Sequence, residues 1–174
     1  IKVSQLAGFI SEKTEYHHGE VSLQGTIVNM AQDFVGSNNI NILTPNGNFG
    51  TRRSGGKDAS SARYIFTQLN ELAPYIFRNE DNCVLKHCYE DGRKIEPVFY
   101  PTVIPVALIN GVEGIGTGFS TDIPSFNPLE VIDNIKHLLK KEDTKQMKPW
   151  YYGFTGRVIK KDDTTSESIG KYKI

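Results

Sequence analysis

The chain has 174 residues, 38% of them hydrophobic and 23% charged, and its 20 lysines and arginines balance its 20 acids. This composition is typical of a globular protein that is large enough to bury a core. No apolar run is long enough to cross a bilayer and no signal-peptide pattern is present, so we expect a soluble protein without a membrane partner. Because the chain begins at Ile1 rather than Met, it looks like an excerpt from a longer polypeptide.

Two helices are expected near the start of the chain. Residues 3–10 favour a short helix, and residues 22–34 repeat apolar side chains at the period of an amphipathic helix that Gly36 can end. Between them stands YHHGE at 16–20, whose adjacent histidines point in different directions and so cannot share a metal ion. One of them can face a ligand while the other is structural. A helix entered through a tight turn has the form of a helix-turn-helix reader, but a plain surface helix shows the same pattern.

A strand is predicted over 38–43, followed by a turn at 45–47 and by a second strand over 63–67. This strand-loop-strand arrangement is that of a wing. The loop between the strands is rich in glycine, at 50, 55 and 56, which lets a backbone approach an anion closely. The loop and the residues after it carry four cations against one acid, Asp58; the cations are Arg52, Arg53, Lys57 and Arg63. This local charge predicts a polyanionic ligand although the net charge is zero.

Tyr64 follows Arg63 at the mouth of an apolar run. A guanidinium can clamp a phosphate with two hydrogen bonds, and a phenolic oxygen held beside it can attack that phosphate. The pair therefore has the equipment for a covalent phosphotyrosine. The same residues also fit a solvated loop followed by a core tyrosine on a strand.

The middle of the chain contains the strongest hairpin signal, Asp91-Gly92 between apolar runs at 84–89 and 95–100. Before it, residues 69–76 favour a short helix that Pro74 disturbs. Cys83 and Cys88 are too sparse for a zinc site, and we expect reduced thiols without chemistry.

Two glycine-rich stretches fail as nucleotide-binding motifs. An apolar run over 103–109 leads into NGVEGIGTG at 110–118, which lacks the spacing of a dinucleotide fingerprint because Phe119 stands where the third glycine should be. The loop at 50–57 fails as a P-loop because Asp58 follows its lysine.

A helix begins after Asn127, with Asn as its cap and Pro128 at its first position. Its predicted apolar face consists of Leu129, Ile132, Ile135, Leu138 and Leu139. Pro124 marks a plausible domain boundary before this helix, and residues 150–160 favour a strand pair after it.

Four motifs occur in order along the chain: YHHGE at 16–20, NGNFGT at 46–51, RYIF at 63–66 and NGVEGIGTG at 110–118. Together they resemble the DNA breakage-reunion region of type IIA DNA topoisomerases, specifically the eukaryotic type, which includes enzymes of some large DNA viruses. The resemblance covers residues 1–160. The corresponding bacterial gyrase chain shares the order of the motifs but departs from the RYIF and GIGTG forms.

The resemblance implies an α+β fold, with a winged-helix DNA-cleavage domain over 1–120 and the beginning of an α/β tower domain over 121–174. It implies that Tyr64 is the nucleophile that becomes linked to a 5′ phosphate, that Arg63 clamps this phosphate, and that His18 stabilises the transition state. Ile115 would wedge between base pairs and bend the DNA. The other DNA-binding residues predicted with them are Arg52, Arg53, Lys57 and His17.

The implied function is that of one part of an ATP-dependent type II DNA topoisomerase. Such an enzyme makes a transient double-strand break, passes a second duplex through it and religates, so that DNA is relaxed or decatenated. The implied partners are double-stranded DNA and a second copy of the same polypeptide, in a homodimer. Mg²⁺ and ATP would bind outside this chain, so residues 1–174 alone should be inactive. The location would be the nucleus for a cellular enzyme, and the host cytoplasm or the virion for a viral one.

Side-chain chemistry limits these roles. A free tyrosine has a pKa near ~10 and needs help to attack at neutral pH, whereas the guanidinium of Arg63 cannot act as a base. His18 could accept the proton or donate a hydrogen bond to a phosphate oxygen, and the sequence leaves both open. A non-catalytic winged-helix DNA-binding module, in which Tyr64 only packs or touches a phosphate, is the alternative, and a nuclease without a covalent intermediate is a third possibility.

Overall fold

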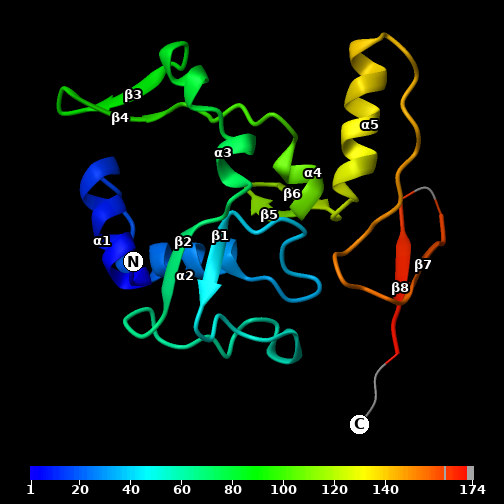
Figure 1. The fold of residues 1–174 in the computed structure, drawn as a ribbon, viewed down its shortest axis with the longest axis horizontal. Helices are drawn as coiled ribbons and strands as arrows, with labels where there is room; N and C mark the ends of the chain where they lie inside the picture. Colours follow the sequence, from blue (N-terminus) through cyan, green and yellow to red (C-terminus); the bar gives the residue numbers. More distant parts are fainter. Residues whose placement is uncertain (163, 172–174) are drawn as a thin grey trace. The chain divides into compact units, whose positions relative to one another are not determined.

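The computed structural model describes residues 1–162 and 164–171 and shows an α+β chain (Figure 1). The chain divides into two compact units: unit 1 comprises Ile1–Asp33 and Asn41–Val103, and unit 2 comprises Phe34–Ile40 and the residues from Ile104 onward. No helix among the described residues is both long and apolar enough to span a bilayer. The expected domain boundary at residue 120 stays a prediction, and the last part of the second domain, at 163 and 172–174, lies outside the described residues.

Unit 1 begins with two helices, α1 (Val3–Thr14) and α2 (Glu20–Ala31), so both predicted helices are confirmed. The second helix ends earlier than predicted, because Gln32 turns to extended backbone and Gly36 plays no part in the end. The two helices bury one apolar face against a small sheet. The core that results consists of Val3, Ala7, Leu23, Ile27, Ala31, Leu43, Phe49, Ala62 and Ile65.

The first strand lies later than the sequence predicts. Instead of a strand over 38–43 and a turn at 45–47, β1 runs Leu43–Asn46 and pairs antiparallel with β2, Phe66–Leu69. Pro45 lies inside β1, opposite Thr67. A two-stranded sheet has only edge strands, so a proline without an amide hydrogen is tolerated there. Because β2 starts at Phe66, Tyr64 lies beside the strand and not within it.

The rest of unit 1 contains short elements: η1 (Arg52–Ser54), α3 (Ala73–Ile76), η2 (Asn79–Cys83), β3 (His87–Glu90) and β4 (Arg93–Pro97). The predicted hairpin is confirmed, since β3 pairs with β4 and the turn residues Asp91 and Gly92 have φ of 46° and 77°, as a type I′ turn requires. Pro74 stands in the first turn of α3, where a missing amide is no loss. Pro74 therefore helps to start this helix and does not disturb it.

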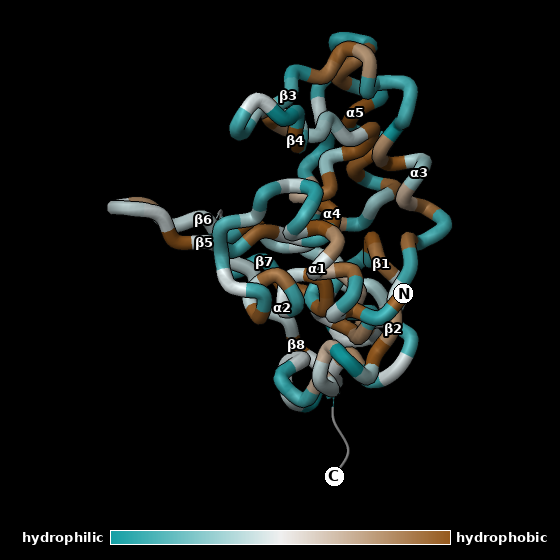
Figure 2. Tube along the Cα trace, turned by 90° about the vertical axis from the view of Figure 1, so that its left-hand side faces the viewer, coloured by the Kyte–Doolittle hydropathy of each residue, from teal (hydrophilic) through white to brown (hydrophobic). Residues whose placement is uncertain are grey.

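Unit 2 contains α4 (Val106–Asn110), the hairpin of β5 (Val112–Gly116) and β6 (Phe119–Ile123), α5 (Pro128–Leu139), and the hairpin of β7 (Arg157–Lys160) and β8 (Ser166–Ile169). The glycine-rich motif at 110–118 thus forms the end of α4 and the β5–β6 hairpin, which the tube in Figure 2 shows as an extended two-stranded arm. The strand pair predicted within 150–160 includes β7, but its partner β8 lies outside that range.

Asn39 ties distant parts of unit 2 together through its side chain. Its amide nitrogen lies 2.8 Å from the carbonyl oxygen of Ile109, 3.1 Å from that of Phe126 and 3.0 Å from that of Trp150. Its amide oxygen accepts the backbone N–H of Tyr152 at 2.8 Å. One side chain therefore satisfies four backbone groups that no helix or sheet ladder satisfies.

The helix α5 begins as predicted, because the Asn127 side chain accepts the N–H of Leu129 at 2.9 Å. The predicted apolar face is largely wrong: Val131 and Asn134 are the buried positions, Ile132 and Ile135 are half-buried, and the three leucines at 129, 138 and 139 are exposed. Asn134 is buried because its amide exchanges two hydrogen bonds with the backbone of Lys145, at 2.9 and 2.8 Å.

We predict that Asn39→Ala lowers the free energy of unfolding by about 2–3 kcal/mol, since it removes partners from four backbone groups at once. Asn41→Ala is the matched control, because the Asn41 side chain donates one hydrogen bond, to the carbonyl of Leu43 at 2.7 Å. This control should lose about 1 kcal/mol. Urea unfolding of the two variants measures the difference, and equal losses would contradict the role of Asn39.

Candidate functional site

Arg63 and Tyr64 are held outward between two buried anchors. Ala62 is 8% exposed and Ile65 is 1% exposed, whereas Tyr64 is 68% exposed. The first amides of α1 bind the carbonyls of both anchors, with Val3 donating to Ile65 at 3.0 Å and Ser4 to Ala62 at 3.2 Å. These helix-start amides have no partner within α1, so the segment 62–65 satisfies them while α1 fixes the segment.

The two outward side chains lie against each other. The guanidinium carbon of Arg63 is 5.2 Å from the centroid of the Tyr64 ring, a cation–π contact. A core tyrosine on a strand is therefore excluded, because Tyr64 is exposed and precedes β2. The arrangement presents a phenol and a guanidinium together on an open surface, where both can reach one phosphate group.

The basic loop is closed by its own polar groups and not by ion pairs with its cations. Asp58 accepts the N–H of Thr51 at 2.7 Å and its hydroxyl at 2.8 Å. These hydrogen bonds, the backbone one first, hold the pKa of the Asp58 carboxyl below its usual range. Asn48 donates to the Asp58 carbonyl at 2.8 Å. Asp58, predicted as an isolated acid among cations, is thus a structural brace.

Two of the loop glycines serve this closure. Gly50 and Gly56 have φ of 96° and 80°, and a Cβ at Gly50 would lie 2.5 Å from the carbonyl oxygen of Gly56. A Cβ at Gly56 would lie 2.3 Å from the amide nitrogen of Gln32, which donates to the carbonyl of Phe49 at 2.9 Å. The close approach at these glycines is therefore that of the loop to itself and to Gln32. The side chains of Arg52, Arg53 and Lys57 remain exposed.

The two histidines have separate surroundings, as the sequence predicts. His17 lies 2.9 Å from a carboxylate oxygen of Glu90, and the His18 ring makes an edge contact with Tyr16 at 5.4 Å between centroids. Within the described residues, no hydrogen bond or ring contact joins His18 to Tyr64. The structure of this chain alone therefore does not bring His18 to the phenol.

The β3–β4 hairpin holds the histidine segment at two points. Beside the pair of His17 and Glu90, the Arg93 guanidinium donates to Glu15 at 3.1 Å. Glu90 and Arg93 face each other across the turn. Sequence reasoning missed these partners because they lie more than seventy residues from the histidines and carry no motif.

Ile115 lies on β5 in unit 2, opposite Ser120, and is 93% exposed. An apolar side chain so exposed on a short hairpin is available for insertion elsewhere, as the predicted wedge requires. The isoleucine side chain has no packing role within unit 2.

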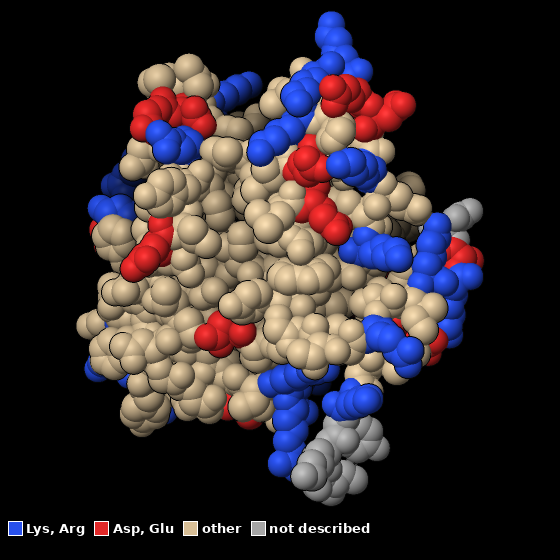
Figure 3. Space-filling view, turned by 45° about the vertical axis from the view of Figure 1, so that its right-hand side comes forward, with Lys and Arg blue, Asp and Glu red and all other residues tan. Residues whose placement is uncertain are grey.

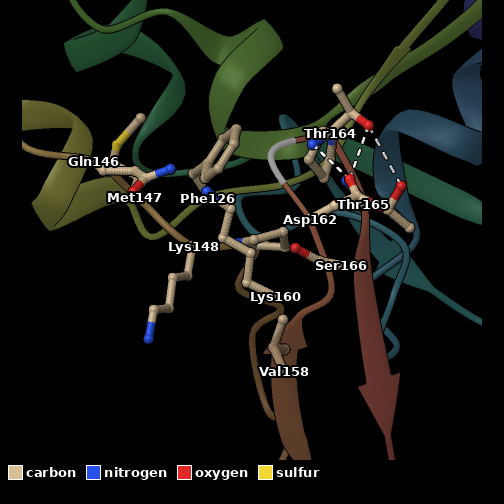
Figure 4. Close-up of a pocket in the computed structure, with 12 residues that line it drawn as sticks. Phe126, Gln146, Met147, Lys148, Val158, Lys160, Asp162, Thr164, Thr165 and Ser166 are labelled. Carbon is tan, nitrogen blue, oxygen red and sulfur yellow. Dashed lines mark hydrogen bonds between the residues drawn. The ribbon is translucent and has the colours of Figure 1, made fainter.

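The candidate residues do not line a cavity. The best-formed hollow, about 180 Å³, lies in unit 2 between the segments at 146–149 and 158–166 (Figure 4). Its acid, Asp162, already accepts the amides of Thr164 and Thr165 at 2.8 and 2.7 Å. On the face shown in Figure 3, lysines and acids are intermixed, and Lys145 pairs with Asp133 at 2.8 Å.

No group of three His, Cys, Asp or Glu side chains in the described residues could hold a metal ion. Mg²⁺ therefore does not fit a site within this part of the chain, and we derive no step through it. Cys83 and Cys88 are free thiols.

A sequence profile of the DNA gyrase/topoisomerase IV family, built on the DNA-cleaving chain of those enzymes, matches residues 1–174. The chain belongs to this family. Within the family it is 52% identical over 174 residues to DNA topoisomerase 2 top-2 of Caenorhabditis elegans and 56% identical over 158 residues to DNA topoisomerase 2 of Saccharomyces cerevisiae. These matches cover 100% and 91% of this chain and 11% of each relative. The resemblance to the eukaryotic type, drawn from the four motifs, is confirmed.

The fold has the same relationship. The structure superposes with a TM-score of 0.95 and 55% identity on a crystal structure of the Plasmodium falciparum topoisomerase II DNA-binding, cleavage and re-ligation domain. The match covers 100% of this chain and 24% of that one. The α+β fold class is thereby confirmed. Because the chain spans about a tenth of its curated topoisomerase relatives, the activity of the whole protein is a matter for proposal.

We predict that the basic loop loosens as the pH falls. Because the pKa of Asp58 is lowered in the folded loop, the bonds to Thr51 are present above about pH 4 and are lost as the pH falls below the ordinary carboxyl range. Hydrogen exchange of the Thr51 amide should therefore lose protection in acid, and Asp58→Asn should lose it at neutral pH. Asp162→Asn, which removes a similar brace in unit 2, should leave the Thr51 amide unchanged. A Thr51 amide that stays protected in Asp58→Asn would contradict the brace.

Proposed function

We propose that this chain is the DNA-cleaving part of a type II DNA topoisomerase that breaks both strands of a duplex through a 5′-phosphotyrosine link. The observation that carries the proposal is the pair of Arg63 and Tyr64, exposed side by side on a segment whose neighbours Ala62 and Ile65 are buried. The open surface around the pair suits an extended polymer better than a small molecule. The family membership supports DNA as that polymer.

The reaction exchanges one phosphodiester for another. The Tyr64 hydroxyl oxygen attacks phosphorus, the bond from phosphorus to the 3′ oxygen breaks, and the 5′ phosphate stays on the tyrosine. The phenolic proton leaves to a base, and the 3′ oxygen leaves as a hydroxyl once it has taken a proton. Because the phosphotyrosine ester replaces a DNA ester of similar energy, religation needs no ATP, and ATP would serve the passage of the second duplex.

Each side chain has a part that its chemistry allows. Arg63 stays charged and lowers the energy of the negative charge that builds on the phosphate. His18, the predicted transition-state stabiliser, would approach the same phosphate on DNA binding, either as a base or as a hydrogen-bond donor. Its exposure and its edge contact with Tyr16 leave the ring free to do so.

The DNA-binding surface would combine the basic loop with α2. Arg52, Arg53 and Lys57 would bind phosphates without reading sequence. The exposed positions of α2 beyond Glu20 carry no charge: Val21, Ser22, Gly25, Thr26, Asn29 and Met30. A helix of this kind can lie close to DNA, and together with β1 and β2 as a wing it forms the proposed winged-helix arrangement over 1–120. His17 would contact DNA only if it left Glu90.

The complete enzyme would require parts that residues 1–174 do not supply. Mg²⁺ and ATP would bind elsewhere in the polypeptide, residues 121–174 would begin a tower domain, and two copies of the polypeptide would cut the two strands. We place the enzyme in the nucleus of a cell, or in the host cytoplasm or virion if the source is a virus. A winged-helix module without chemistry would use the same basic loop and differs in forming no covalent adduct.

We predict that Tyr64→Phe in the complete protein abolishes the covalent DNA adduct and leaves non-covalent DNA affinity within a few-fold, because only the attacking oxygen is removed. Tyr75→Phe is the matched control, since Tyr75 is also 68% exposed and has no guanidinium beside it. Gel analysis after a denaturant quench detects the adduct. Adduct from Tyr64→Phe, or its loss in Tyr75→Phe, would refute the assignment.

We predict that Arg63→Lys cleaves nearly as poorly as Arg63→Ala, because a point charge cannot reproduce a planar fork on a phosphate. Arg53→Lys, on the loop, should retain most activity, since a phosphate contact that only positions DNA tolerates a lysine. Single-turnover cleavage rates compare the three variants. A rate near wild type for Arg63→Lys would show that charge alone is needed at this position.

A further inference from the structure

The β5–β6 hairpin is exposed along almost its whole length. Every residue from Val112 to Asp122 is exposed, and the two largest side chains in the strands, Ile115 and Phe119, are 93% and 83% exposed (Figure 2). The register pairs Ile115 with Ser120 and Gly116 with Phe119. Since directly opposite residues share a face, Ile115 lies on one face of the ribbon and Phe119 on the other.

Gly114 and Gly116 have no reason within this chain to be glycine. Neither has a positive φ, a Cβ at Gly114 would meet nothing within 4 Å, and one at Gly116 would meet only the carbonyl oxygen of Phe119, at 3.9 Å. Gly111 differs, since its φ is 77° and its Cβ would lie 2.8 Å from the carbonyl oxygen of Ile123. Glycine inside a strand weakens it and often marks the close approach of another molecule.

The charges on the hairpin have a sharp boundary. The eight residues from Gly114 to Thr121 carry no charge, and they are bounded by Glu113 and Asp122, which face each other across the strands. Like charges in this position destabilise a hairpin. Among the described residues neither carboxylate has an ion-pair partner, so nothing within the chain offsets that cost.

We propose that the uncharged tip at 114–121 enters a groove of duplex DNA, that Gly114 and Gly116 provide clearance for a sugar-phosphate wall, and that Glu113 and Asp122 limit the depth of entry. The inference rests on the proposed function, in which Ile115 wedges between base pairs. A wedge must pass through a groove, and the minor groove is about 6 Å wide, too narrow for a ribbon with side chains on both faces.

The register fits this arrangement. Gly114 and Gly116 share the face away from Ile115, so they thin the ribbon behind the wedge. Phe119 is the one large side chain on that face of the tip, and it lies at the pair nearest the turn, where its ring would meet the groove floor. Glu113 lies about 7 Å along the strand from Ile115, far enough for the wedge to enter before the carboxylates meet the phosphates.

The test measures non-covalent binding of the complete protein to a duplex at fixed salt, with fluorophores at the DNA ends to report bending. Gly114→Ala and Gly116→Ala should each raise Kd about tenfold and reduce the bend, because each methyl overfills a close contact. Gly8→Ala, an equally open glycine on α1, should change neither. Glu113→Gln combined with Asp122→Asn should lower Kd severalfold, because repulsion of the phosphates is removed.

Glycine variants that bind and bend DNA like Gly8→Ala would overturn the proposal. So would a lower melting temperature of Gly114→Ala without DNA, which would show that another part of the protein covers this face. The wild-type adduct is measured in parallel. If the adduct forms and the hairpin variants have no effect, the hairpin inference alone fails, whereas absence of any adduct refutes the proposed function.

Discussion

The site depends on the hydrogen bonds between the start of α1 and the segment that carries Arg63 and Tyr64. The amides of Val3 and Ser4 would otherwise be unsatisfied, and the carbonyls of Ile65 and Ala62 satisfy them. The same two residues bury their side chains in the core of unit 1. Backbone and side-chain constraints thus act together, so the phenol and the guanidinium are positioned before any ligand binds. Such preorganisation lowers the cost of reaching a reactive geometry.

The cations of the site are left available because the loop does not use them for its own closure. Asp58 binds Thr51, Asn48 binds the backbone beyond it, and Gln32 fills the space that Gly56 leaves. A loop closed by its own lysines and arginines would have to lose those contacts when DNA binds. Here the neutral polar groups give the shape, so the exposed cations can meet phosphates without disturbing it.

Local signals made much of the fold predictable. The Asp91-Gly92 turn and the Asn127 cap were identified because a turn or a cap depends on neighbouring residues. The position of β1 was wrong, because Asn39 binds backbone groups up to 113 residues away and so takes that stretch out of the sheet. The exposed leucines of α5 defeat periodicity for the same reason, since Asn134 holds Lys145 against the helix. Arg63 and Tyr64 were predictable from their chemistry, whereas their α1 anchors and the Glu90 contact of His17 join residues too distant to carry a pattern.

The central claim is that the oxygen of Tyr64 becomes joined to DNA. The most direct measurement incubates the complete protein with Mg²⁺ and duplex DNA, stops the reaction with denaturant, digests protein and DNA, and locates the nucleotide-bearing peptide by mass spectrometry. We predict that the modified peptide contains Tyr64 and that the tyrosine carries the 5′ phosphate of the broken strand. A nucleotide on another residue such as Tyr75, or broken strands with free ends and no modified peptide, would contradict the account.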